Sequence, residues 1–287
     1  VMLMNMKEVL SVAQQHKFGI GAFNIASAEF ARAVIEVAEK LRSPVILEIH
    51  PDEHDFTGDD FIFYLRELAI KATVPVVIHL DHGQTLEQVM RAIRTGYTSV
   101  MIDASAHPLE DNIAITRRVT EVAHAAGVSV EAELGTIGVA QGSGEDGHGE
   151  ILYTDPQQAE QFVNETGVDT LAVAIGTSHG LYPAGMQPKL DIERLKSIKQ
   201  RLTIPLVLHG GSGNKDEEVA ESIQHGVGKI NISSDMKKAF FVALEEELKS
   251  GSHEPNSLFI RPMEAAKAVV VRKMHLFSSI GKAALYV

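Results

Sequence analysis

Histidines next to glycines stand at the ends of three short apolar runs in this 287-residue sequence: His82, His179 and His209. Neutral imidazoles from three separate elements, with a fourth position open to water or substrate, are the ligand set of a catalytic zinc ion. The sequence has no cysteine, so the ligands of any metal must come from His, Asp or Glu. The three histidines therefore predict a metal centre, against the alternative of a polar rim without a metal.

A fourth histidine, His79, lies three residues before His82. Side chains three apart on an extended strand face opposite ways, so we expect His82 to be the ligand and His79 a structural residue. Asp81 is the acid/base candidate if the strand turns there, so that Asp81 and His82 both face the cleft. The alternative for Asp81 is a carboxylate that only orients a histidine ring.

Further carboxylates end the next two runs. Glu131 and Glu133 are two residues apart and share one strand face, and Asp103 ends the run before them. Paired carboxylates beside a metal can bind a second ion, orient the histidines or pair with lysine. We assign Glu133, and by the same argument Asp103, to the surroundings of the site, with Glu131 as the weaker candidate.

The apolar runs predict the scaffold that positions these residues. They are rich in Val, Ile and Leu without strict alternation, which is typical of parallel strands covered on both faces. Amphipathic helical segments lie between them, including residues 28–41, 86–94 and 112–125. Eight strand–helix units in order predict an α/β fold, the TIM (β/α)8 barrel, with a doubly wound open sheet as the alternative. The eight runs span residues 18–23, 44–49, 75–80, 99–103, 128–134, 170–175, 205–209 and 229–232.

We expect residues 1–287 to form one barrel catalytic domain, with residues 254–277 as an additional C-terminal helical segment. Residues 135–149 break the alternation because they are too rich in glycine for regular structure. A glycine-rich loop at the strand-end rim of a barrel predicts a mobile lid. The alternative is an inert surface loop.

Two turns near the end of the chain have the composition of a phosphate site. TIM barrels often bind phosphate with the loops that follow strands seven and eight. Here those positions hold Gly210-Gly211-Ser212-Gly213 and Asn231-Ile232-Ser233-Ser234. Glycines let backbone N–H groups approach an anion, and serine hydroxyls add donors. The two turns together predict that the site binds phosphate.

The formal net charge of −12 argues against nucleic acid and against an anionic membrane surface, because both require clustered Lys and Arg. The absence of cysteine fits a reducing compartment. The chain begins without a secretory pattern, and no run approaches the roughly 20 apolar residues of a membrane helix. We expect a soluble cytoplasmic protein with no nucleic-acid or membrane partner.

Seven segments together resemble the class II ketose-bisphosphate aldolases, which include the fructose-1,6-bisphosphate and tagatose-1,6-bisphosphate enzymes. They lie at residues 22–25, 79–83, 101–105, 130–135, 172–180, 205–213 and 229–232, in order along nearly the whole chain. The resemblance implies a zinc-dependent aldehyde-lyase. Such an enzyme reversibly cleaves a ketose 1,6-bisphosphate to dihydroxyacetone phosphate and glyceraldehyde 3-phosphate, as a homodimer or homotetramer.

The resemblance also implies roles for individual residues. Asp81 matches the acid/base that exchanges a proton with the C4 hydroxyl, and Glu145 matches the lid carboxylate that moves the proton at C3. Asn231 matches the residue that positions the dihydroxyacetone phosphate portion. The zinc ligands match His82, His179 and His209, and positions near an alternative metal site match Asp103 and Glu133. The remaining substrate and phosphate positions, with a monovalent cation (Na+ or K+) nearby, match Asn24, Gly180, Gly210, Gly211, Ser212, Ser233 and Ser234.

Three features depart from the family pattern. Residues 50–54 (His-Pro-Asp-Glu-His) stand where relatives usually carry small or hydroxyl residues, and Ser233 stands where fructose-bisphosphate enzymes often carry Asp. Arg261 falls where some relatives bind the distal end of the substrate across a dimer, the alternative being a surface arginine at a helix start. The sugar therefore stays open, and an aldolase for another ketose 1-phosphate or sugar-acid phosphate is an alternative.

Two other functions remain as competitors. One is a non-catalytic, sugar-phosphate-binding metalloprotein, against which Asp81 and Glu145 argue, because binding alone needs no acid/base pair. The other is a class I aldolase, which would need a Schiff-base lysine in the cleft. The lysine in the predicted strands is Lys229, which we place at the strand entrance, at the end of the barrel away from the cleft.

Overall fold

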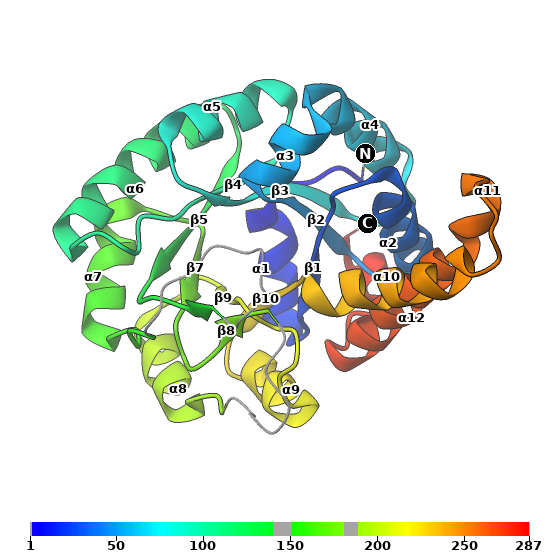
Figure 1. The fold of residues 1–287 in the computed structure, drawn as a ribbon. Helices are drawn as coiled ribbons and strands as arrows, with labels where there is room; N and C mark the ends of the chain where they lie inside the picture. Colours follow the sequence, from blue (N-terminus) through cyan, green and yellow to red (C-terminus); the bar gives the residue numbers. More distant parts are fainter. Residues whose placement is uncertain (1, 140–150, 181–188, 287) are drawn as a thin grey trace.

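Parallel strands close into an eight-stranded barrel in the computed structural model, which describes residues 2–139, 151–180 and 189–286 (Figure 1). The strands follow one another around the barrel in chain order, and the last pairs with the first. The prediction of a TIM barrel is confirmed. The barrel strands are β1 (Ile20–Asn24), β2 (Val45–Ile49), β3 (Val76–Gly83), β4 (Ser99–Ile102), β5 (Ser129–Leu134), β7 (Thr170–Val173), β9 (Leu206–Leu208) and β10 (Val227–Ile232).

Helices form the outer layer around the strands (Figure 1). Segment 28–41 is helical as predicted, and two helices instead of one separate β2 from β3. None of the helices in the described ranges is long and apolar enough to cross a membrane. Those that follow β1 to β9 are α2 (Ala28–Leu41), α3 (Pro51–Thr57), α4 (Asp59–Lys71), α5 (Leu86–Thr95), α6 (Leu109–Ala125), α7 (Pro156–Thr166), α8 (Ile192–Arg201) and α9 (Asp216–Gln224).

An N-terminal helix that the sequence pattern did not predict, α1 (Met6–His16), closes one end of the barrel. It is started by a capping box, in which Asn5 and Glu8 each accept a hydrogen bond from the backbone N–H of the other. Its buried face, which includes Met6 and Leu10, packs against inward side chains of β1, β2 and β3. The strand entrances are therefore sealed by an apolar plug.

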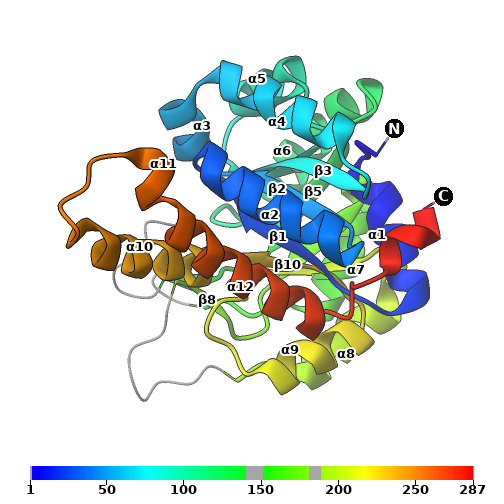
Figure 2. The ribbon, with the colours of Figure 1, turned by 90° about the vertical axis from the view of Figure 1, so that its right-hand side faces the viewer.

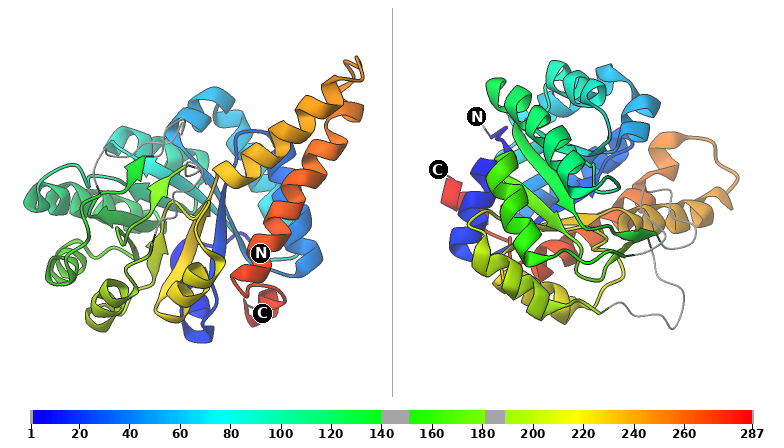
Figure 3. Two further views of the ribbon diagram at one scale, coloured as in Figure 1. Left: turned by 60° about the horizontal axis from the view of Figure 1, so that its bottom comes forward. Right: turned by 90° about the vertical axis from the view of Figure 1, so that its left-hand side faces the viewer.

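The C-terminal helical segment predicted at residues 254–277 is present as α11 (Pro255–Leu258) and α12 (Ile260–Leu276), followed by the short 3-10 helix η1 (Lys282–Tyr286). Helix α12 packs along α10 (Ser234–Leu248) and α2, and the α10–α12 pair extends beyond the barrel wall (Figures 2 and 3, orange). A buried ion pair of 2.7 Å between Lys273 and Asp235 ties α12 to the first turn of α10. This pair fixes the start of α10 at the rim.

On β2 and β3 the inward side chains, which lie two residues apart, change from apolar to ionisable towards the rim, because alternate residues of a barrel strand face the interior. On β2, Ile46 belongs to the apolar plug and Glu48 follows it. On β3, Val77 of the plug is followed by His79 and then Asp81. The interior therefore has three tiers: the apolar plug, a buried charged tier, and a polar rim where the strands end.

Candidate metal centre and active site

Three histidine rings meet at the rim. His82 on β3, His179 on β8 (Ser178–His179) and His209 directly after β9 are all buried. Their ring centroids are 5.0 Å apart for His82 and His179, 4.6 Å for His82 and His209, and 6.0 Å for His179 and His209. One nitrogen from each ring lies within 4.8 Å of the others. The structure thus brings together the three residues that the sequence singled out.

A bulge in β3 explains how Asp81 and His82 come to line the same cavity. Leu80 pairs with Val100, but Gly83 pairs with Ile102, so the register shifts between them. His82 adopts a left-handed backbone with φ of 45°, which costs a residue other than glycine on the order of 1 kcal/mol. The strand turns at the position where the acid/base interpretation of Asp81 required a turn.

His79 lies deeper than the rim. Its Nδ1 is 2.9 Å from the Ser99 hydroxyl, and its Nε2 is 3.3 Å from Glu131. The side chain has no exposure to solvent. These contacts place His79 in the charged tier below the metal centre.

His179 is held by a local feature that the apolar runs did not reveal. It lies beyond the end of β7, on the two-residue strand β8, which pairs in parallel with β6 (Gly138–Val139). Strand β6 belongs to the glycine-rich segment that was predicted to be a lid. Residues 140–149 of that segment, including Glu145, lie outside the described residues.

The donor set fits a divalent metal. His82 uses Nδ1 for a 2.9 Å contact with Asp103, which leaves its buried Nε2 without a hydrogen-bond partner. His209 uses Nε2 for a 2.7 Å contact with Glu131, and its buried Nδ1 makes no hydrogen bond but lies 3.1 Å from a Glu133 carboxylate oxygen. Buried polar atoms without partners are rare in native proteins. Carboxylates that fix the tautomer of a histidine are typical of metal sites.

The electrostatics of the rim also favour a cation. Burial alone would lower the pKa of His209, but the neighbouring carboxylates of Glu131 and Glu133 raise it to about 9. Asp103 and Glu133 form a second ligand-like group with His82, at the positions that the resemblance connects with an alternative metal site. Negative charge concentrates around the three imidazoles, and a divalent ion would neutralise it.

Two carboxamides hold the Asp81 carboxylate. Asn24 Nδ2 donates to one oxygen at 3.1 Å, and Asn231 Nδ2 donates to the other at 3.2 Å. Burial would raise the pKa of Asp81, but the positive charges of His82 and Lys229 outweigh it and lower the pKa. Asp81 is therefore ionised at neutral pH and can accept a proton.

The charged tier beneath the rim contains an ion network that sequence reasoning missed. Lys229 is fully buried, and its Nζ lies 2.9 Å from Glu131 and 3.2 Å from Glu48. Burial would lower the pKa of Lys229, but these two carboxylates raise it. The lysine stays protonated and below the rim, which removes it as a Schiff-base nucleophile. Inward alternation along β10 is the signal that could have placed it inside the barrel.

The two predicted phosphate turns meet at the start of α10. Ser233 precedes this helix without capping it through its side chain, and its buried hydroxyl has no hydrogen-bond partner. The free N–H groups of a helix start favour an anion, and at this one the Asp235 N–H donates to the Ser212 hydroxyl at 3.4 Å. The Gly211 N–H instead donates to the Asn231 carbonyl at 3.1 Å. A Cβ on Gly211 would lie 2.6 Å from the same oxygen, so this glycine allows the two turns to pack closely.

The remaining sequence candidates fall into two groups. Gly211 and Ser234 belong to the two turns but are not among the residues that line the cavity, whereas Arg261 is exposed at the start of α12 and pairs with Glu247 at 2.8 Å. His50, which was not among the candidates, lines the cavity with its ring centroid 6.4 Å from that of His82. It follows β2 directly, so the strand-end rule could have found it. The cavity is lined by Asn24, His50, Asp81, His82, His179, Gly180, Gly210, Ser212, Asn231 and Ser233.

Comparisons with known proteins agree with this geometry. Residues 4–282 match the family model described as fructose-bisphosphate aldolase class-II. The fructose-bisphosphate aldolase of Geobacillus stearothermophilus is 42% identical, over 98% of this chain and 99% of the relative. That of Thermus caldophilus is 39% identical, over 98% of this chain and 100% of the relative.

Two solved aldolase structures have the same fold as this chain. The YdjI aldolase from Escherichia coli K12 superposes with a TM-score of 0.87 at 36% identity, covering 98% of this chain and 100% of that one. A putative fructose-1,6-bisphosphate aldolase from Coccidioides immitis has a TM-score of 0.88 at 32% identity, covering 98% of both chains. The match extends over nearly the whole chain, and the chain therefore belongs to the class II fructose-bisphosphate aldolases, a family of zinc-dependent lyases.

Proposed function

We propose that this enzyme reversibly cleaves fructose 1,6-bisphosphate or tagatose 1,6-bisphosphate to dihydroxyacetone phosphate and glyceraldehyde 3-phosphate. The observation that carries the proposal is one cavity in which His82, His179 and Asp81 adjoin the two glycine- and serine-containing turns, with the third histidine, His209, grouped with the other two directly before the first turn. His82, His179 and His209 would hold the zinc ion, His82 through Nε2 and His209 through Nδ1. When bound, zinc supplies positive charge that polarises a carbonyl group and stabilises negative charge developing beside it.

Asp81 carries the proton step at C4 in this proposal. Its carboxylate accepts the C4 hydroxyl proton while the C3–C4 bond breaks, so that C4 becomes the aldehyde carbon of glyceraldehyde 3-phosphate. The electron pair of that bond passes to the fragment that contains C1 to C3, which is then protonated at C3. By resemblance, Glu145 delivers this second proton. Asn24 and Asn231 hold Asp81 in place, and Asp81 returns its proton in the condensation direction.

The turns supply the phosphate subsite. The backbone of Gly210 and the hydroxyls of Ser212 and Ser233 face the cavity. Ser234 and the first turn of α10 add N–H donors, and Asn231 positions the dihydroxyacetone phosphate portion through its unpaired Oδ1. We place a monovalent cation, Na+ or K+, beside Gly180 and these turns, as the resemblance implies.

Cleavage assays test the proposal directly. Zinc-loaded protein is given each bisphosphate, and triose phosphate release is followed with and without EDTA. Turnover that EDTA abolishes and zinc restores supports the assigned reaction, and the ratio of the two rates identifies the sugar. Absence of turnover of both substrates by protein with bound zinc would overturn the bisphosphate assignment.

A second candidate is an aldolase for another ketose 1-phosphate or a sugar-acid phosphate. The observation that favours it is His50, whose imidazole lines the cavity where relatives usually carry small or hydroxyl residues. Unchanged turnover of a substrate without the distal phosphate would favour this candidate. Loss of turnover would favour the bisphosphates.

We further propose that residues 1–287 work as one catalytic domain in a cytoplasmic homodimer or homotetramer. Large apolar side chains are exposed on the α10–α12 pair, among them Phe241 at 58% and Ile260 at 61%. Arg261 is next to Ile260, where it would reach towards a neighbouring subunit. Light scattering on the purified protein tests this, and a monomer at micromolar concentration would contradict it.

A further inference from the structure

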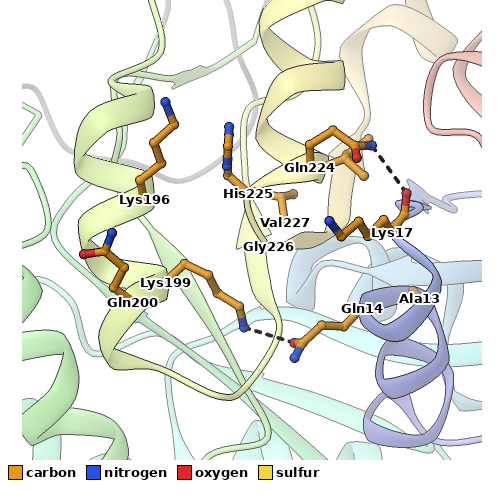
Figure 4. Close-up of a pocket in the computed structure, with 11 residues that line it drawn as sticks. Ala13, Gln14, Lys17, Lys196, Lys199, Gln200, Gln224, His225, Gly226 and Val227 are labelled. Atoms are coloured by element: carbon orange, nitrogen blue, oxygen red, sulfur yellow. Dashed lines mark hydrogen bonds between the residues drawn. The ribbon is translucent and has the colours of Figure 1, made fainter.

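A second cavity lies at the opposite end of the barrel from the metal centre. It has a volume of about 460 Å³ and is walled by the end of α1, the last turns of α8, the end of α9 and the start of β10 (Figure 4). This volume is within the range of small-molecule sites. Neither the proposed reaction nor the family match assigns it a role.

The side chains around this cavity are basic and amidic, although the chain as a whole carries a net charge of −12. Lys17 reaches towards it from one wall, and Lys199 from the other (Figure 4). Among the described residues that line it, none is Asp or Glu. The polar lining residues are Gln14, Lys17, Lys196, Lys199, Gln200, Gln224 and His225.

Two of the ammonium groups lack a negative partner. No ion pair in the described ranges involves Lys17. Within those ranges Lys199 donates to neutral oxygens only, the Gln14 side chain at 3.1 Å and the carbonyls of Ile204 at 2.7 Å and Thr203 at 3.4 Å. Burial lowers the pKa of Lys199 to about 8. A nearby carboxylate would oppose that shift, so the cavity has positive charge that the protein leaves without compensation.

Helix dipoles account for part of this charge only. Helices α1, α8 and α9 end here, and helix C-termini attract cations. Lys199 donates to the Ile204 carbonyl, which lies beyond the end of α8 and is not one of its terminal carbonyls. Lys17 serves the end of α1 with its backbone, since its N–H caps that helix by donating to Ala13 and Gln14. Its ammonium group forms no ion pair with the described residues and can therefore bind an anion.

The wall of this second cavity also has an apolar part, and it includes a glycine with a positive φ angle. Ala13, Ile223 and Val227 line the cavity beside the lysines. Gly226 has a φ of +107°, and a Cβ there would lie 2.5 Å from Cδ of Lys199, so glycine lets the lysine stem cross the backbone at this point. Cations, carboxamides and an apolar surface together suit a molecule with a phosphate group and a short organic portion.

We propose that this cavity binds a small phosphate monoester, with the phosphate held between Lys17 and Lys199 and the organic portion against Ile223 and Val227. The site is separate from the phosphate turns at Ser212 and Ser233, because it lies at the other end of the strands. The carboxamides of Gln14 and Gln224 provide hydrogen bonds for hydroxyl groups of the ligand.

Nuclear magnetic resonance of the zinc-loaded protein distinguishes the two sites, with inorganic phosphate and glycerol 3-phosphate as probes. We expect saturable shifts of the Gln224, Gly226 and Val227 amides, in addition to those of Gly210 and Ser233 at the catalytic end. Glycerol 3-phosphate binds this cavity more tightly than inorganic phosphate, because only the ester contacts the apolar wall.

Lysine variants provide the decisive comparison. Lys17→Gln raises the dissociation constant measured at Gly226 by about twofold to fivefold, and Lys17→Arg restores binding. Lys40→Gln, an equal charge change at an exposed site outside the cavity, leaves it unchanged. Lys199→Gln serves as a second variant if its spectrum shows a folded protein. Shifts confined to the catalytic end, or equal effects of Lys17→Gln and Lys40→Gln, would overturn the proposal.

Discussion

Glu131 accepts a hydrogen bond from Nε2 of His209 at 2.7 Å inside the barrel, where neither side chain reaches solvent. With the proton on Nε2, Nδ1 of His209 carries the lone pair that a metal requires. The other oxygen of Glu131 is held by Lys229 at 2.9 Å. The charged tier therefore sets the tautomer of a proposed metal ligand from below.

Removing the charge of Glu131 is expected to weaken zinc binding. Glu131→Gln lowers zinc affinity about 10- to 100-fold, as loss of a carboxylate that orients a metal-bound histidine does elsewhere. Competition with a chromophoric chelator measures it. Lys229 keeps Glu48 as a partner at 3.2 Å, so thermal unfolding should still be cooperative. The exposed Glu110→Gln is the matched control, and equal affinities for both variants would contradict this role.

Asp81→Asn separates catalysis from metal binding. The amide cannot accept the C4 hydroxyl proton, so kcat should fall about a hundredfold to ten-thousandfold. The three histidines are unchanged, so the zinc content determined by elemental analysis should stay near that of the unaltered protein. Turnover close to normal would assign the proton step to another group and contradict the mechanism proposed for Asp81.

His50→Ser tests the cavity wall that departs from the relatives. The smaller side chain enlarges the cavity beside His82, so the kcat/KM ratio between substrates with and without a distal phosphate should change about tenfold. The exposed His107→Ser serves as the control. An unchanged ratio would show that the imidazole does not contact the substrate and would remove the observation favouring the second candidate.

Lys199 should make stability depend on alkaline pH. Burial lowers its pKa in the folded protein to about 8, from 10.5. Between these values the unfolded chain binds more protons, so this group makes the free energy of unfolding rise with pH. Relative to Lys199→Gln, the unaltered protein should therefore gain stability between about pH 8 and about pH 10. Urea denaturation measures it, and parallel pH profiles of the two proteins would contradict the shift.

The rim was predictable because parallel strands of a barrel end on the same side. Knowing where the apolar runs stop is enough to bring Asp81, His82 and His209 together. The charged tier was not predictable in the same way. Runs buried on both faces lack the alternation that separates inward from outward residues, so Glu48 gave no sign of its direction, and for Lys229 the one sign was its two-residue spacing from Asn231. Helix α1 was missed for a different reason, since it precedes the repeating strand–helix order.

His179 shows a further limit. It was placed at the end of a run, but the structure holds it through the short β6–β8 pairing, which has no apolar run of its own. The pairing partner, Val139, belongs to the glycine-rich segment that was treated as a loop. Contacts of this kind join segments that are far apart in sequence, and they depend on tertiary structure more than on local pattern.

The three tiers of the barrel interior divide the chain into positions that can change during evolution and positions that resist change. In the charged tier each residue neutralises another, so a single substitution there leaves a buried charge without its partner. At the rim, His50 stands at the edge of the cavity, and replacing it breaks no ion pair of that tier. New substrates can therefore be acquired by exchanging rim residues one at a time, while the machinery beneath is inherited as a block.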